Sequence, residues 1–378
     1  MNETFIPVNQ PLLSGNEKKY LDECIDTGWI SSEGPFVSRF EREFSAAVDC
    51  NYSVAVCNGS VALDVAVAAL KIVPGDEVIM PTFTIISCAA AIYRAGAMPV
   101  LVDCDPYTWN MDVHKIESLI THRTKAIMAV HIYGLPVDMN PIIELAKKYG
   151  LKVIEDAAQA IGQTYNGRQC GSIGDISTFS FYPNKHITTG EGGMVSTNDP
   201  YLAERSASLR NLCFVNSRRF IHEELGWNYR MTNLQAAVGV AQLEQLSNHL
   251  SIKRNIGLKY LELLSNIDEL QLPLDKTEYA DNLFWVFGLV LKSKVSINAK
   301  EFMGRLTDKG IGTRPFFYPM HRQPVFNNMG MFVDESHPVS EKLYERGLYL
   351  PSGLSLTEEE VSKAVSAVKQ VLFEINNV

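Results

Sequence analysis

The chain lacks the marks of a secreted or membrane-bound protein. Its seven cysteines are scattered over 378 residues and form no C-x-x-C pair, which favours reduced thiols over a disulfide framework. The first residues, Met-Asn-Glu-Thr-Phe-Ile-Pro, have neither the basic nor the apolar region of a secretory signal. No apolar run approaches the roughly 18 residues that a membrane-spanning helix needs. We therefore expect a cytoplasmic protein without a membrane partner.

A net positive charge, metal-ligand spacing and common nucleotide-binding loops are also missing. The net charge of -9 argues against nucleic acid or an anionic membrane as the main partner. The eight histidines and seven cysteines do not have metal-ligand spacing, so no metal site is predicted. The chain contains neither a P-loop nor a G-x-G-x-x-G motif. An anionic small molecule stays compatible with this charge, because it needs only a local basic pocket.

What is present indicates an α/β protein with two domains. Short apolar strands alternate with helical patterns over much of the first 200 residues, which predicts a mainly parallel sheet covered by helices. A helix is predicted over 233–249. From about Ile252 the pattern changes to a long helix, an aromatic strand-like segment over 283–290 and a terminal helix. The length also favours two domains over one. We expect a large domain over residues 1–250 and a smaller one over residues 251–378.

One lysine stands in an unusual setting. Lys185 lies in a loop between the aromatic residues that follow Phe179 and the glycine-rich turn that ends at Gly193. A lysine acts as a nucleophile when burial or a cationic neighbour lowers its pKa and an aldehyde is available. This segment leads to the hypothesis that Lys185 forms a Schiff base with pyridoxal phosphate.

That cofactor also requires an acid at its ring nitrogen and a site for its phosphate. Asp156 comes just after a buried strand, although a helix cap on the following Ala-Ala-Gln-Ala is the alternative reading. Asn58-Gly59-Ser60 ends a strand and begins a helix, which suits an anion, although a plain helix cap also explains it. In parallel sheets ligands bind at the carboxyl ends of strands. Asn58, His131, Asp156 and Lys185 all fall there, and His131 is either a site residue or a core histidine.

The motifs together resemble those of the DegT/DnrJ/EryC1/StrS family of pyridoxal-phosphate-dependent sugar-nucleotide aminotransferases, over essentially the whole chain. The motifs that carry the resemblance are Asn58–Leu63, Gly75–Val78, His131–Gly134, Glu155–Gln159, Gly174–Ser180, Lys185 with Thr189–Gly193, Asn228–Met231, Thr313–Pro315 and Leu350–Ser352. The resemblance implies the aspartate-aminotransferase fold, which is fold type I of the pyridoxal-phosphate transferases. This fold has a large domain with a mainly parallel central sheet and a smaller C-terminal α+β domain. It further implies a homodimer whose active sites use residues of both subunits.

The resemblance assigns a role to each matching position. Lys185 would be the Schiff-base lysine that carries protons, and Asp156 the partner of the ring nitrogen. The other cofactor contacts would be Gln159 at the ring hydroxyl, Ile85 over the ring where relatives have an aromatic, Gly59, Ser60 and Ser180 at the phosphate, and Asn228 from the second subunit. The residues facing the nucleotide sugar would be Trp29, Ile30, Ser31, His186, Arg230, Arg314, Tyr318 and His321.

The neighbour of Lys185 provides a test of the reaction type. Some relatives have histidine in place of the lysine and are 3-dehydratases, and here His186 follows Lys185 directly. The reactive position lies five residues after Ser180 and six residues before Glu191. Both counts give Lys185 and not His186. We therefore expect an aminotransferase, with a 3-dehydratase or a non-catalytic regulator as the alternatives.

The substrate is predicted from likeness alone. The segments around Trp29, Thr188–Met194 and Gly226–Asn233 look most like family members that aminate C4 of GDP-4-keto-6-deoxymannose with L-glutamate, which leaves 2-oxoglutarate. A UDP- or dTDP-linked keto sugar is the runner-up.

Overall fold

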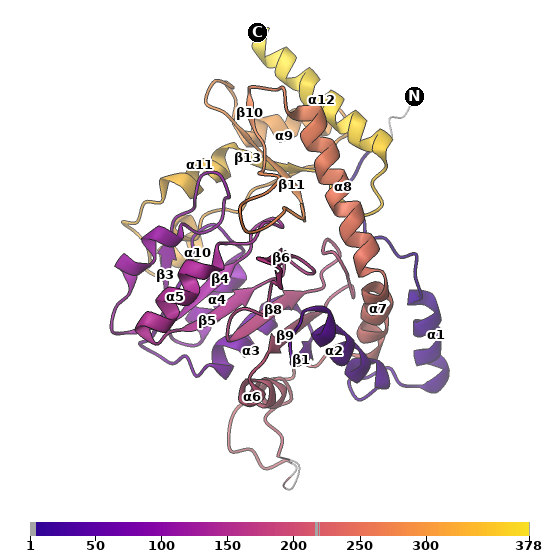
Figure 1. Cartoon of the computed structure of the whole chain (residues 1–378), viewed down its shortest axis with the longest axis vertical. Coiled ribbons are helices and arrows are strands. Elements are labelled where there is room, and N and C mark those ends of the chain that lie inside the picture. Colours follow the sequence, from indigo (N-terminus) through magenta and orange to yellow (C-terminus); the bar gives the residue numbers. More distant parts are fainter. Residues whose placement is uncertain (1–4, 216–217, 219, 378) are drawn as a thin grey trace.

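The computed structural model describes residues 5–215, 218 and 220–377. Residues 1–4 and Val378, the outer ends of the two expected domains, lie outside this range. Figure 1 shows a large sheet surrounded by helices and, above it, a smaller sheet next to the C-terminal helix. The helix α8 (Leu246–Leu264) runs from the larger part into the smaller one.

The large sheet has seven strands in the order β1-β9-β8-β5-β4-β2-β3. Their bounds are β1 Tyr52–Val56, β2 Glu77–Pro81, β3 Met98–Val102, β4 Thr124–Val130, β5 Lys152–Asp156, β8 Ile176–Ser180 and β9 Gly193–Thr197. β9 is antiparallel to both of its neighbours, and the other pairings are parallel. The predicted mainly parallel sheet is therefore confirmed. The carboxyl ends of all strands except β9 meet at one edge.

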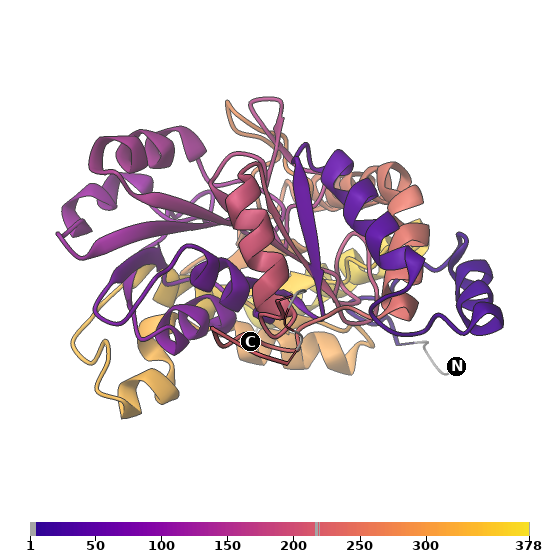
Figure 2. The ribbon, with the colours of Figure 1, turned by 90° about the horizontal axis from the view of Figure 1, so that it is seen from below.

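Helices cover both faces of this sheet, as the view in Figure 2 shows. One face packs against α3 (Gly59–Ala69), α4 (Ile86–Arg94) and α6 (Pro200–Arg210), and the other against α2 (Pro35–Ala47), α5 (Met139–Tyr149) and α7 (Asn233–Glu244). α1 (Glu17–Thr27) packs on α7. Successive strand residues point to opposite faces, so apolar residues at every position are needed to bury both.

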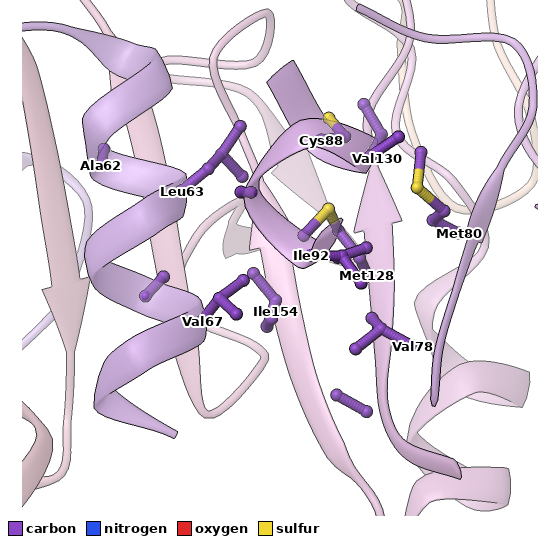
Figure 3. Packing of buried hydrophobic residues seen from close by; sticks show 14 of the residues in the cluster. Ala62, Leu63, Val67, Val78, Met80, Cys88, Ile92, Met128, Val130 and Ile154 are labelled. Carbon is purple, nitrogen blue, oxygen red and sulfur yellow. The ribbon is translucent and has the colours of Figure 1, made fainter. Parts of the chain in front are cut away.

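The core beside α3 and α4 illustrates this packing. Figure 3 shows Leu63 and Val67 of α3 pointing toward Ile154 of β5, and Ile92 of α4 beside Met128 of β4. Each of these side chains is 6% exposed or less. Burying one such side chain stabilises the fold by roughly 1.5–3 kcal/mol. The starts of α3 and α4 are thereby fixed near the carboxyl edge of the sheet.

The smaller part is an antiparallel sheet in the order β10-β11-β13-β12. Its strands are β10 Leu270–Gln271, β11 Phe287–Leu291, β12 Arg314–Pro315 and β13 Gly347–Leu350, and its helices are α9 Ala299–Asp308, α11 Pro338–Arg346 and α12 Glu358–Asn376. Ile6, from the N-terminal arm, belongs to the same hydrophobic core. The helix α8 crosses the expected domain boundary at 250/251 without a break, and that boundary stays a prediction.

Short elements complete the described chain. They are β6 Thr164–Tyr165, β7 Arg168–Gln169, α10 Pro324–Asn328 and 3-10 turns at Val113–Lys115, Glu117–Leu119 and Met320–Arg322. In the part of the chain that the structure describes, no helix combines the length and the apolarity needed to cross a bilayer.

Two predicted elements differ from the structure. The helix predicted over 233–249 is two helices, because Gln245 has a non-helical backbone (φ -100°, ψ 3°) between α7 and α8. The strand predicted over 283–290 begins only at Phe287, since Phe284 has a left-handed backbone with φ of 54°. Asn282 Oδ1 accepts a hydrogen bond from Phe284 N at 2.8 Å and stabilises this turn. The turn brings Trp285 to the edge of the large sheet, beside Lys185.

Candidate active site

A cavity of about 740 Å³ lies at the carboxyl edge of the large sheet, and we call it the lysine cavity. Seven of the eight predicted cofactor residues line it, namely Gly59, Ser60, Ile85, Asp156, Gln159, Ser180 and Lys185. They come from five separate stretches of the chain, which the parallel topology brings to one edge. A single chain thus gathers nearly all of the predicted cofactor site.

Lys185 lies in the turn that follows β8, and its backbone N–H donates to Tyr182 O at 2.9 Å. The side chain is half-buried, because one side of it faces the cavity. Its Nζ lies 3.9 Å from the centroid of the Trp285 ring. Burial lowers the pKa of Lys185 to about 8, and the nearby charge of Asp156 opposes this shift. The neutral fraction of this amine near physiological pH is therefore much larger than for an ordinary lysine, as a nucleophile or general base requires.

Asp156 is the last residue of β5 and is 3% exposed. Its Oδ1 accepts a hydrogen bond from Ala158 N at 3.1 Å, and its Oδ2 accepts one from Cys88 Sγ at 3.2 Å. Residues 157–162 form turns and no helix, so the carboxylate caps no helix there. The Asp156 carboxylate stabilises a turn through Oδ1 and lines the lysine cavity.

The start of α3 forms a cradle on another side of the cavity. Asn58 Oδ1 accepts from Val61 N at 3.0 Å and caps the helix, as one reading of the sequence predicted. Ser60 Oγ lies 2.7 Å from Ser87 Oγ. A Cβ on Gly59 would lie only 2.6 Å from Ser180 Cβ, so glycine is needed for this close approach. Backbone N–H groups and hydroxyls at a helix N-terminus suit an anion such as a phosphate.

Buried hydroxyls without partners also face this cavity. Thr178 Oγ1 and Tyr133 Oη are buried and have no hydrogen-bond partner among the described residues, and both residues line the cavity. Gln159 Oε1 accepts from Tyr133 N at 2.8 Å. Buried polar atoms are rarely left unpaired, which indicates a polar ligand. A phosphate cradle, a buried amine and a buried acid around one cavity fit pyridoxal phosphate.

A second cavity, of about 930 Å³, holds much of the predicted substrate site, and we call it the lip cavity. Trp29, Ile30, Ser31 and Arg230 line it, and none of them lines the lysine cavity. Arg230 donates to Asn211 Oδ1 within the same region. Asn228, predicted to reach the phosphate from a second subunit, lines neither cavity.

The other predicted substrate residues lie outside both cavities. His186 is fully buried, and both of its ring nitrogens lack partners among the described residues. Arg314 is exposed in β12, and the Tyr318 ring packs against Tyr344 with centroids 4.7 Å apart. His321 lies between Thr82 Oγ1 at 3.0 Å and Glu341 Oε1 at 2.9 Å. Contact of these four residues with a substrate stays a prediction.

His131 is a core histidine, the second of the two readings left open. Its Nε2 lies 3.2 Å from Glu155 Oε2, and its Nδ1 accepts from Val137 N at 3.3 Å. Both ring nitrogens are thus satisfied away from the cavity.

Sequence reasoning missed part of the cavity wall. The additional lining residues include Arg94, Tyr133, Thr178, Tyr229, Trp285, Phe317 and Tyr349. Most carry no local motif and reach the cavity only through the tertiary fold. Three of them had a signal, because Tyr133, Thr178 and Tyr229 lie in the motifs His131–Gly134, Gly174–Ser180 and Asn228–Met231. Tyr133 also has a left-handed backbone with φ of 55°.

Comparison with known proteins agrees with this geometry. The model of the DegT/DnrJ/EryC1/StrS aminotransferase family matches residues 11–369. The chain is 45% identical over 357 residues to a GDP-perosamine synthase of Escherichia coli O157:H7, covering 94% of this chain and 96% of that protein. It is 42% identical over 367 residues to a GDP-perosamine synthase of Caulobacter vibrioides, covering 97% and 98%. An aminotransferase structure from Psychrobacter cryohalolentis superposes with a TM-score of 0.92 at 30% identity, covering 99% of this chain and all of the other.

Proposed function

The chain belongs to the DegT/DnrJ/EryC1/StrS aminotransferase family, and from this premise we propose that it transfers the amino group of L-glutamate to C4 of GDP-4-keto-6-deoxymannose. The products would be GDP-perosamine and 2-oxoglutarate. The chain is a pyridoxal-phosphate-dependent sugar-nucleotide aminotransferase. The choice of GDP and of this sugar is supported by the two relatives named GDP-perosamine synthase.

The observation that carries the proposal is the pairing of Lys185 and Asp156 across one cavity. Pyridoxal phosphate, when bound, supplies an aldehyde that carries the amino group and a conjugated ring that accepts electrons. The residues proposed to hold it are Lys185, Asp156, Gln159, Ile85, Gly59, Ser60 and Ser180, with Asn228 of the partner subunit.

The proton steps follow from these positions. Lys185 Nζ takes a proton from the α carbon of glutamate and, in the second half of the reaction, delivers a proton to C4 of the sugar. The carboxylate of Asp156 keeps a proton at the ring nitrogen. Over both halves the α carbon of glutamate is oxidised to a ketone while the sugar ketone is reduced to an amine, so no outside oxidant or reductant is needed. The lowered pKa of Lys185, about 8, suits an amine that both accepts and returns a proton.

We further propose a homodimer in which the lip residues, Asn228 and Arg230 of one subunit complete the lysine cavity of the other. Two observations support it. These residues do not line the lysine cavity of their own chain. The lip cavity exposes two large apolar side chains, with Trp29 50% and Ile30 49% exposed. Exposed apolar side chains gathered in one region are typical of a protein interface.

A direct assay tests the proposed reaction. The purified chain with pyridoxal phosphate and L-glutamate is given GDP-, UDP- and dTDP-linked 4-keto-6-deoxy sugars, and 2-oxoglutarate and the amino sugar are measured by mass spectrometry. We expect equal amounts of both products and the highest kcat/KM with the GDP-linked sugar. Faster turnover of a UDP- or dTDP-linked sugar would contradict the nucleotide assignment. A deoxygenated sugar formed without 2-oxoglutarate would indicate the 3-dehydratase, and absence of both turnover and bound cofactor would indicate the regulator.

A further inference from the structure

Trp285 contacts the amine of Lys185 directly. Its ring is 4% exposed, lines the lysine cavity and lies 3.9 Å from Lys185 Nζ at its centroid. The electron-rich face of an indole attracts a protonated amine and also excludes water from it. Trp285 comes from the smaller part of the fold, so the amine lies between two parts of the molecule.

Two hydrogen bonds fix the orientation of Trp285. Its indole N–H donates to Asn184 O at 2.7 Å, on the residue just before Lys185. Its carbonyl accepts from Lys253 Nζ at 3.0 Å. The first bond ties the ring to the turn that carries the reactive lysine, and the second ties its backbone to α8.

Lys253 is a buried lysine to which the proposed reaction gives no role. It is 1% exposed, and Nζ also donates to Ser352 O, at the end of the small-domain strand β13. Within the described residues no carboxylate lies within ion-pair distance of it. Burial and the charge of Lys185 lower the pKa of Lys253 to about 7. Burying a lysine without an acid costs stability, which indicates a function at this position.

We propose that Trp285 is a positioning residue for the Lys185 amine and that the buried Lys253 holds Trp285 in place. The proposal rests on the function proposed above, in which Lys185 carries the protons. The ring keeps the amine shielded from water and in one place while it gains and loses a proton. Lys253 joins α8, Trp285 and the Ser352 carbonyl, and so couples the small domain to the catalytic lysine.

Other titratable groups around this unit do not compete for the same role. His186 and His249 lie nearby, and burial lowers the pKa of both below its usual value, so both are neutral at physiological pH. Asp156 is the acid that acts on Lys185, and it raises the pKa of the amine. Lys253 is itself mostly neutral in the pH range where Lys185 titrates, because its own pKa is lowered to about 7.

The test compares Trp285→Phe and Trp285→Leu with Trp109→Phe. Trp109 is a matched control, because it is 3% exposed and its indole N–H has no hydrogen-bond partner among the described residues. Losing the buried bond to Asn184 should lower kcat roughly tenfold in Trp285→Phe, and more in Trp285→Leu, with KM for the sugar within about twofold. Trp109→Phe should keep the wild-type kcat.

The second readout does not depend on turnover. The cofactor is removed from the full chain, Lys185 is labelled with acetic anhydride over a range of pH, and its peptide is quantified by mass spectrometry. The pH at which labelling of Lys185 is half-maximal, the labelling midpoint, should lie near 8 in the wild type. It should rise by about one unit in Trp285→Leu, because water reaches the amine. It should also rise in Lys253→Met, because Trp285 loses the hydrogen bond to its carbonyl and no longer shields the amine from water, and stay in Lys259→Met, a partly exposed lysine on the same helix.

The outcomes separate this proposal from the proposed function. Unchanged kcat and an unchanged labelling midpoint in the Trp285 and Lys253 variants of an active enzyme would overturn the positioning role alone. A wild-type chain that shows no cofactor bound at Lys185 would instead overturn the proposed function. If Trp285→Leu does not fold, the more conservative Trp285→Phe carries the test.

Discussion

The two cavities of this chain are built in different ways. Residues at strand ends and helix starts of one sheet line the lysine cavity, so a single chain brings them together. Segments at the outside of the large domain line the lip cavity, where Trp29 and Ile30 are half exposed. The parallel sheet therefore brings together the proposed cofactor residues of one chain, whereas the proposed substrate side lies on a surface that we propose a second subunit covers. Substitutions in the two cavities should consequently reduce enzyme activity in different ways.

The largest effect should come from the lysine itself. Lys185→Ala removes the amine proposed to carry protons and to bind the cofactor, and turnover should fall by at least about 10³-fold. Absorbance of the bound cofactor should change with it. His186→Asn is the neighbouring control and should keep the absorbance band, even if its turnover changes. The opposite pattern, with the band lost only in His186→Asn, would show that the register is shifted by one residue.

The lysine cavity was predictable because its signals are local. Lys185 lies in a glycine-rich loop, Asp156 follows a buried strand, and Gly59 begins a helix, and each pattern is visible within a few residues. A mainly parallel sheet then places strand ends at one edge, so their proximity follows from the fold class. The alternation of strands and helices was itself sufficient to predict that class.

What was missed depends on long-range packing. Trp285 reaches the cavity because Phe284 adopts a left-handed backbone, and nothing in Leu283–Val290 distinguishes that turn from a strand. Lys253 resembles any lysine of an amphipathic helix until the Trp285 and Ser352 carbonyls surround it. Arg230 and Asn228 do not line the lysine cavity of their own chain, and the role proposed for them requires subunit assembly.

Neutralising the acid should have the next largest effect. Asp156→Asn keeps the shape of the side chain and can still accept from Ala158 N, but it loses the charge proposed to hold a proton on the ring nitrogen. We expect kcat to fall by about 10²-fold while the cofactor remains bound. Asp138→Asn is the control, since Asp138 accepts from Tyr165 at the same side of the sheet but lines neither cavity. Equal kcat in Asp156→Asn and wild type would remove Asp156 from the reaction.

A smaller effect should follow from filling the phosphate cradle. In Gly59→Ala the new methyl group would meet Ser180 Cβ at 2.6 Å, so either the serine or the start of α3 must move. Affinity for pyridoxal phosphate should fall roughly tenfold, as measured by a fluorescence titration of the chain without cofactor. Gly304→Ala in α9 has no atom within 4 Å of its new methyl group and should bind the cofactor normally. Equal affinities in the two variants would place the phosphate elsewhere.

The smallest expected effect is a fall in turnover of about twofold. It tests most directly whether the lip cavity of one subunit completes the lysine cavity of the other. Lys185→Ala and Asn228→Asp are each placed on a differently tagged chain, and the doubly tagged dimers are purified. If sites are shared, one site of this mixed dimer has both intact residues, and it should show about half of the wild-type turnover. The control places both substitutions on one chain and pairs it with a wild-type chain. Shared sites leave this second dimer without an intact site, whereas sites built within one chain leave it with one. Turnover in the second dimer and none in the first would therefore show that each chain completes its own active site. The lip cavity of one chain would then have no role in the active site of the other.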